Sequence, residues 1–155
     1  MDFEKANNWL NLVANIAILG GLLFLALEIQ QNTNAVRAAA VQEATNVARE
    51  HPLLYVQNPE VNRLAMADYA SLSEADKRRR FWLDVSFWHA MQGLYRQNEL
   101  GTFPQQEWEV WVRIICANYE QSEPELWARA AMTHASDFVE FVEDCEGGAV
   151  KILPE

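Results

Sequence analysis

The sequence is short of positive charge. It has 12 Lys and Arg residues against 22 Asp and Glu residues, which gives a formal net charge of −10. A protein that binds nucleic acid through its phosphates needs a surplus of basic side chains to displace the condensed counterions. We therefore predict that nucleic acid is not a partner of this protein.

Cysteine is scarce as well. The only two cysteines are Cys116 and Cys145, and both lie in segments with helical periodicity. No Cys-x-x-Cys or Cys-x-x-His pair occurs, so their spacing fits no zinc site. We interpret the two residues as buried, reduced thiols, because a disulfide between them would require an oxidising compartment.

The sequence also lacks the motifs that identify common enzymes. It contains no His-Glu-x-x-His or Glu-x-x-His spacing for a metal, no glycine-rich phosphate loop and no Gly-x-Ser-x-Gly nucleophile motif. We predict no enzymatic activity, no catalytic residue, no metal and no cofactor. An enzyme of an unfamiliar kind remains an alternative if Glu99, His89 and Arg96 converge in a cleft.

The histidines have ordinary structural interpretations. His51 precedes Pro52 and is expected at the end of a helix, where a cation interacts favourably with the helix dipole. His89 lies between Trp88 and Ala90 in an aromatic stretch, where we expect a half-exposed histidine with satisfied hydrogen bonds.

Helix-forming patterns are abundant, and no stretch alternates as a strand does. The sequence predicts an all-α protein, with one helix from Trp9 to Glu50 that continues into a domain of about five helices. Starts of later helices are predicted at four places. These are Asn58-Pro59, Ser73 with Asp76, Thr102-Phe103-Pro104 and Ser122-Glu123-Pro124. Ser136-Asp137 is expected to cap a last short helix, and Gly101 to end the helix that Ser73 begins.

Aromatic residues are frequent, with six Trp, seven Phe and four Tyr. Large aromatic side chains fill protein cores efficiently. We expect five tryptophans to pack in the core of the helical domain, and the alternative is an aromatic-lined ligand pocket. The five are Trp82, Trp88, Trp108, Trp111 and Trp127.

No charged residue occurs between Ala6 and Leu27. The apolar part of this stretch is about as long as one membrane crossing requires, roughly 20 residues. We predict a transmembrane helix, and the alternative is burial inside a soluble bundle. The residues assigned to the span are Trp9, Leu12, Ile16, Ala17, Gly21, Phe24 and Leu27. Ala17 and Gly21 also form a small-xxx-small pair, which favours close approach of two such helices.

These patterns predict three regions. Residues 1–33 form the membrane helix and its polar exit, residues 34–146 form the helical domain, and residues 147–155 form a flexible tail. The one concentrated run of positive charge is Lys77, Arg78, Arg79 and Arg80. It is interpreted as a solvated helix turn, with contact to anionic lipid headgroups or to the acidic stretch from Asp137 to Glu146 as the alternatives.

The segment from Leu25 to Arg37 reads Leu-Ala-Leu-Glu-Ile-Gln-Gln-Asn-Thr-Asn-Ala-Val-Arg. It resembles the helix exit of a large family of uncharacterised bacterial proteins with one N-terminal membrane helix, in which Leu-Ala-x-Gln-Ile-Arg-Gln-Asn-Thr is typical. The likeness continues through Asn58-Pro59-Glu60, the stretch from Tyr69 to Glu74, and Trp82, Gly101 and Trp108. Where this sequence has Glu28, Gln30 and Asn34, members of that family often have Gln, Arg and Arg.

The resemblance implies a single-pass protein of the bacterial inner membrane. Its helical domain is expected in the cytoplasm, because a short, acid-containing N-terminus is easily translocated and because the cysteines are taken as unpaired. For function we predict association with itself or with another membrane protein. The alternative is a sensor or binding module that admits a small apolar ligand or lipid into its aromatic-lined core.

Overall fold

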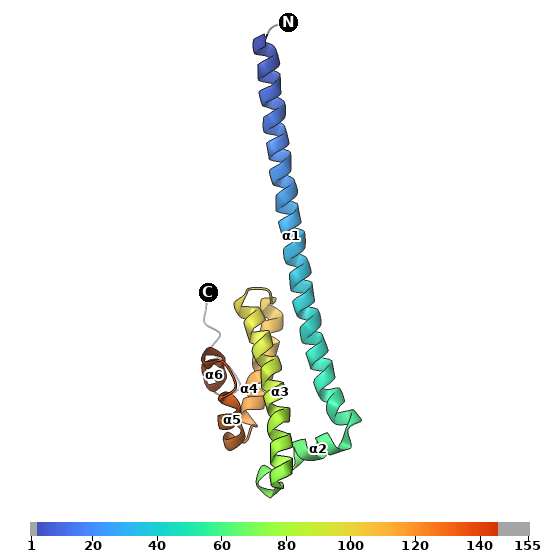
Figure 1. The fold of residues 1–155 in the computed structure, drawn as a ribbon, viewed down its shortest axis with the longest axis vertical. Coiled ribbons are helices and arrows are strands. Elements are labelled where there is room, and N and C mark those ends of the chain that lie inside the picture. The colour runs from blue at the N-terminus through green and yellow to red at the C-terminus, as the bar shows by residue number, and fades with distance from the viewer. Residues whose placement is uncertain (1–2, 146–155) are drawn as a thin grey trace. The chain divides into compact units, whose positions relative to one another are not determined.

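A computed structural model describes residues 3–145, and within that range the protein is all-α, as predicted, with no β-strand. Five helices follow the long first one (Figure 1). The helices are α1 (Phe3–Gln57), α2 (Pro59–Met66), α3 (Glu74–Glu99), α4 (Gln105–Glu120), α5 (Pro124–Ala131) and α6 (Ser136–Glu143), with a 3₁₀ turn η1 (Tyr69–Ser71) between α2 and α3. The predicted flexible tail, residues 147–155, lies outside the described residues.

The chain divides into two compact units, and the boundary lies within α1. The first unit is Met1–Ala38 and the second is Ala39–Glu155. The second unit therefore contains the last part of α1 together with all the other helices. We call it the helical domain below, and each unit is described by itself.

Helix α1 is longer at both ends than the sequence indicates. It was predicted from Trp9 to Glu50 and is observed from Phe3 to Gln57, with Pro52 inside it. A proline in a helix removes one backbone hydrogen bond, and here the helix continues beyond it. His51 is therefore not at a helix end, and the predicted interaction with the dipole of such an end is wrong.

The predicted starts of α2 and α3 are confirmed. Pro59 occupies the first turn of α2, and the Ser73 side chain accepts a hydrogen bond from the Asp76 N–H at the start of α3. Asn58 precedes α2, but its amide donates to the Leu54 carbonyl at 2.9 Å instead of capping α2. Gly101 follows the end of α3 with φ of +66°, a conformation in which a glycine has no steric penalty.

The start of α6 differs from the prediction. Ser136 and Asp137 lie inside its first turn, and Ala135 is the residue that precedes it. The Asp137 carboxylate accepts a hydrogen bond from the Phe138 N–H and two from the Arg96 guanidinium on α3. Asp137 thus joins α6 to α3, which the local sequence pattern does not show.

The core of the helical domain is formed by residues of five helices. Phe138, Ile115, Val142, Cys116 and Ala130 are fully buried. Helix α1 contributes Ala40 and Ala44 to the same cluster, α3 contributes Val85, Trp88, Met91 and Leu94, and α4 contributes Trp108, Trp111 and Val112. A smaller cluster of Leu64, Tyr69, Leu72 and Leu126 packs where α2, η1 and α5 meet α3.

Four of the five tryptophans expected in the core are buried, and Trp82 is not. Trp88, Trp108, Trp111 and Trp127 are each at most 7 % exposed, whereas Trp82 is 62 % exposed. In α3, Trp88 and Val85 lie on the face that packs against the core, and Trp82 lies outside it. Because α3 has aromatic residues on both faces, the periodicity of its sequence did not indicate which face is buried.

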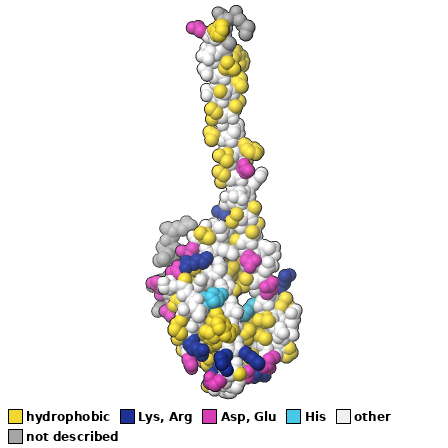
Figure 2. All heavy atoms as spheres, in the orientation of Figure 1, with side chains coloured by type: hydrophobic (Ala, Val, Ile, Leu, Met, Phe, Trp, Pro, Cys, Tyr) yellow, Lys and Arg dark blue, Asp and Glu magenta, His cyan; other side chains and the backbone are white. Residues whose placement is uncertain are grey.

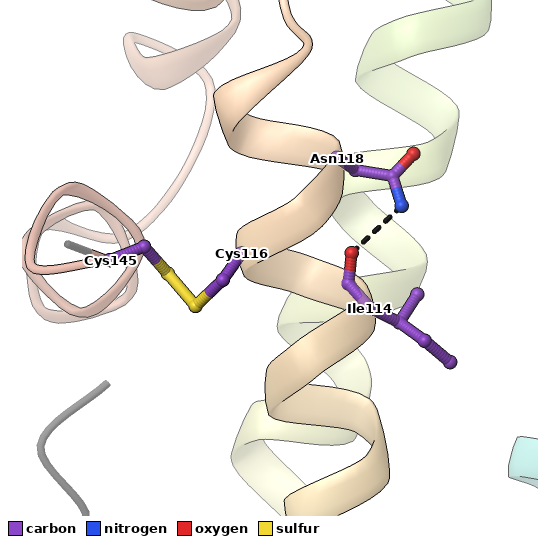
Figure 3. The surroundings of a disulfide bond; sticks show 4 residues. All are labelled: Ile114, Cys116, Asn118 and Cys145. Atoms are coloured by element: carbon purple, nitrogen blue, oxygen red, sulfur yellow. Dashed lines mark hydrogen bonds between the residues drawn. A yellow bond between two sulfur atoms is a disulfide. The ribbon is translucent and has the colours of Figure 1, made fainter. Parts of the chain in front are cut away.

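The interpretation of the cysteines as free thiols is wrong. Cys116 on α4 and Cys145, two residues after α6, form a disulfide with a Cα–Cα distance of 5.3 Å (Figure 3). Both residues are buried in the domain core. The bond closes a loop with a sequence separation of 29, which corresponds to about 3 to 4 kcal/mol of stabilisation through the unfolded chain.

Candidate functional site

The first candidate functional region is the apolar stretch of α1. By length and composition, α1 is the one helix among the described residues that is able to cross a membrane. The large hydrophobic side chains from Trp9 to Ile29 are all exposed, each between 49 % and 69 %. Figure 2 shows hydrophobic side chains along this stretch with few charges among them.

The exposed side chains surround the helix. Ile18, Leu19, Leu22, Leu23 and Phe24 occupy positions all around an axis with 3.6 residues per turn. A helix that packs on one side of a soluble domain has a single apolar face, and one that is apolar all round is buried or spans a membrane. A large exposed apolar surface of this kind is typical of a region that contacts lipid, a ligand or another protein.

The last part of α1 has a different character. Within the helical domain, Ala40 and Ala44 are buried in the core, and Val47 packs partly against it. Val36 and Ala48 are exposed, Val36 at 45 %. The small side chains of Ala40 and Ala44 allow this part of α1 to pack closely against the other helices of the domain.

Three of the four residues in the basic run from Lys77 to Arg80 are paired with nearby acids. Lys77 pairs with Glu74 at 3.2 Å, Arg79 with Asp76 at 3.5 Å and Arg80 with Asp84 at 3.3 Å. None of the ion pairs found among residues 3–145 joins this run to the acids of α6. Nearby acidic residues thus neutralise most of the positive charge of this run. The ion pairs do not support contact with lipid headgroups, which stays a prediction.

The second candidate region is a cleft in the helical domain, formed by the last part of α1 with α2, α3 and α4. Three adjoining hollows, of about 360, 300 and 250 Å³, are each lined by His51 and Phe87. We call these three hollows together the His51 cleft. The apolar part of its lining includes Val47, Pro52, Phe87, Trp88, Met91, Trp111 and Ile114.

His51 is the polar centre of this cleft. Its Nε2 lies 3.1 Å from the Tyr55 hydroxyl, one helical turn along α1, and its ring lies 4.9 Å from the ring of Phe87. Burial lowers the pKa of His51 and raises the pKa of Tyr55. Both side chains are therefore neutral near pH 7, where a histidine offers one hydrogen-bond donor and one acceptor.

Two charged groups of the cleft, Arg80 and Asp84, are paired with each other. Arg80 Nε lies 3.3 Å from Asp84, and its Nη1 donates to the carbonyls of Leu64 and Ala65 at the end of α2. Burial raises the pKa of Asp84, and the nearby Arg80 opposes this change. Arg80 thus satisfies the last carbonyls of α2, a role that its place in a basic run does not indicate.

Of the residues in the alternative enzyme site, neither His89 nor Arg96 lines the hollows described above. Arg96 forms its ion pair with Asp137, whereas His89 lies against His134, with 4.4 Å between the ring centroids. Glu99 lines none of the hollows described above. Within residues 3–145, no three His, Cys, Asp or Glu side chains are grouped as metal ligands would be.

The sequence interpretation missed the His51 cleft. Its polar residues, Tyr55, Arg80, Asp84 and Asn118, come from three helices that are far apart in the chain. The only available sequence signal was the spacing of His51 and Tyr55, which places both on one face of a helix.

No protein-family model, no curated protein and no solved structure matches the chain. The resemblance to the family of bacterial membrane proteins therefore stays a prediction.

Proposed function

We propose that this protein is a single-pass membrane protein that holds its helical domain at a membrane surface and acts by association, with itself or with another membrane protein. The observation that carries the proposal is the apolar stretch of α1 from Trp9 to Ile29, which is exposed all around the helix. Covering it with lipid removes from water the apolar surface that the domain leaves open.

The helix surface supports association within the membrane. Ala17 and Gly21 lie one turn apart. Apart from Gly21 itself, its chain neighbours and the adjacent backbone of α1, no heavy atom of the described chain lies within 4 Å of a Cβ placed at Gly21. Small residues at this spacing allow two membrane helices to approach closely. Gly20, which has equally open surroundings, lies on a different side of the helix and serves as a control position.

Association is tested by crosslinking in native membranes and by light scattering in detergent over a range of concentrations. We expect oligomers, or a crosslinked partner, that Gly21→Leu reduces and Gly20→Leu leaves unchanged. A strict monomer in detergent, together with no crosslinked species in membranes, would contradict the proposal.

We further propose that the helical domain lies on the oxidising side of the membrane. The disulfide between Cys116 and Cys145 is a bond that persists in oxidising compartments and is rare in the cytosol. The cytoplasmic placement predicted from the sequence relied partly on free thiols and loses that support. In a bacterial inner membrane the domain would then face the periplasm.

The flanking charges do not oppose this orientation. Lys5 precedes the apolar stretch, and Arg37 follows it within the distance over which Lys and Arg residues set topology. The two sides are therefore nearly equal in positive charge, and the disulfide becomes the stronger indication of sidedness.

Sidedness is tested by denaturing the membranes without a reductant and then adding a polyethylene-glycol maleimide. We expect no mass increase for the wild-type chain until the disulfide is reduced, and one added polymer on Cys116→Ser or Cys145→Ser without reduction. Two added polymers on the unreduced wild type would overturn the oxidising-side placement and leave the membrane anchor itself unaffected.

A second candidate function is the binding of a small molecule by the helical domain. The His51 cleft favours it, because concave sites with apolar walls and a few convergent polar groups are typical of ligand sites. The site differs from the predicted one, since the cleft opens between helices beside the core. An increase of the unfolding temperature by a ligand is the general test of this function.

A further inference from the structure

The size and the wall of the His51 cleft limit what fits in it. The hollows of about 360 and 250 Å³ share His51, Phe87 and Asn118. Ligand pockets for drug-sized molecules span roughly 300 to 1,000 Å³. Each hollow by itself lies near or below the lower end of that range, which suits a molecule with a single ring. Phe87, Trp88 and Trp111 are aromatic walls, against which another ring packs by stacking or edge contacts.

The cleft also offers hydrogen-bonding atoms that the protein does not use. His51 Nδ1 has no hydrogen-bond partner within residues 3–145, whereas Nε2 is engaged by Tyr55. The Asn118 amide donates to the Ile114 carbonyl at 2.8 Å, which leaves its oxygen as an acceptor (Figure 3). Asn118 and Cys116 project from opposite sides of α4 in this view, so the disulfide is on the side away from Asn118.

Among the described residues, the interior of the cleft has no unpaired charge that would attract a charged ligand. Arg80 and Asp84 neutralise one another, and the guanidinium is further engaged by the carbonyls of α2. His51 is neutral because burial lowers its pKa. Glu50 lines one of the hollows but is exposed to water. A charged ligand in the interior of the cleft would lose its hydration without gaining a buried opposite charge, which is unfavourable.

We propose that the His51 cleft binds a small, uncharged molecule that consists of one aromatic ring and one hydroxyl group, with the ring against Phe87 and Trp111 and the hydroxyl at His51, Tyr55 and Asn118. This inference rests on the second candidate function and names its ligand class. It is independent of the membrane anchor and of the side on which the domain lies.

The test uses the full-length protein in detergent and 4-methylphenol as the probe. Binding is followed by NMR through the indole N–H signals of the six tryptophans. We expect saturable shifts for Trp88 and Trp111, which line the cleft, and none for the exposed Trp82. Trp82 thus reports any non-specific effect of the probe.

Two matched variants test the polar contacts. Tyr55→Phe removes the hydroxyl beside His51 and keeps the ring, and we expect it to weaken the affinity for 4-methylphenol about tenfold. Tyr95→Phe removes a hydroxyl from an aromatic cluster with Phe138 and Phe141, away from the cleft, and should leave the affinity unchanged. Equal loss in both variants, or none in either, would overturn the assignment of the hydroxyl site.

Three related probes test the proposed ligand class separately from the proposal that the cleft binds a ligand. Toluene lacks the hydroxyl, and benzoate and benzylammonium carry a charge. We expect all three to bind more weakly than 4-methylphenol at Trp88 and Trp111. Tighter binding of a charged probe at the same signals would overturn the proposed class and preserve the binding function. No saturable shift at Trp88 or Trp111 with any probe would overturn both.

Discussion

The two stretches of α1 share one secondary structure and differ in their surroundings. From Trp9 to Ile29 every large apolar side chain is about half exposed or more, whereas Ala40 and Ala44 are buried in the helical domain. The first stretch carries large apolar residues without a covering surface, and the second carries small residues that pack closely. Helix formation is therefore local in both, while burial depends on what lies beside the helix.

The largest effect is expected when charge is placed in the exposed apolar stretch. Leu19→Arg combined with Leu22→Arg should release most of the protein from membranes, because each arginine costs about 2.5 to 3.5 kcal/mol at the centre of a membrane helix. Carbonate extraction measures the fraction that remains. Gln42→Arg, at an exposed position of α1 within the helical domain, is the control and should stay in the membrane pellet. Retention of the double variant would argue for burial in a protein partner.

The next largest effect is expected when a phenylalanine is replaced by alanine in each of the two regions. Phe138 is fully buried and Phe24 is 68 % exposed. Phe138→Ala should reduce the free energy of unfolding of the domain by about 3 to 5 kcal/mol, because it leaves a cavity in the core. Phe24→Ala should change it by less than about 0.5 kcal/mol. Urea unfolding in detergent, followed by tryptophan fluorescence, measures both. Similar losses would mean that the apolar stretch also packs on the domain.

A smaller effect is expected from enlarging alanines of α1. Ala44→Leu should destabilise the domain by about 1 to 3 kcal/mol, because it overfills a packed contact. Ala26→Leu, in the exposed apolar stretch, should leave the unfolding midpoint unchanged. The same urea titration compares them. If Ala44→Leu were neutral, the last part of α1 would not be packed as the structure shows.

The smallest effect concerns pH. Burial lowers the pKa of His51 and of His134 in the folded domain. The unfolded chain then binds more protons, so the stability present at neutral pH is lost as the pH falls below about 6.5. We expect a lower unfolding midpoint at pH 5.5 than at pH 7.5, and a smaller difference in His51→Gln combined with His134→Gln. The membrane-bound fraction should be the same at both values, and a pH-dependent release would contradict the separation of the two regions.

Local sequence signals determined the helices and most of their ends. The Asn58-Pro59 pair, Ser73 with Asp76, and Gly101 act through backbone geometry and capping within a few residues, and the uncharged stretch from Ala6 to Leu27 acts through its composition. These signals are readable because the interactions that they reflect are close in the chain.

The tertiary structure decided what depends on contacts between distant residues. It pairs Cys116 with Cys145, leaves Trp82 exposed outside the core, places Asp137 against Arg96, and assembles the His51 cleft from four helices. Each of these results requires side chains that packing brings together across long separations in the chain. Periodicity assigns a residue to a face of its helix, and it does not specify which other helix that face will meet.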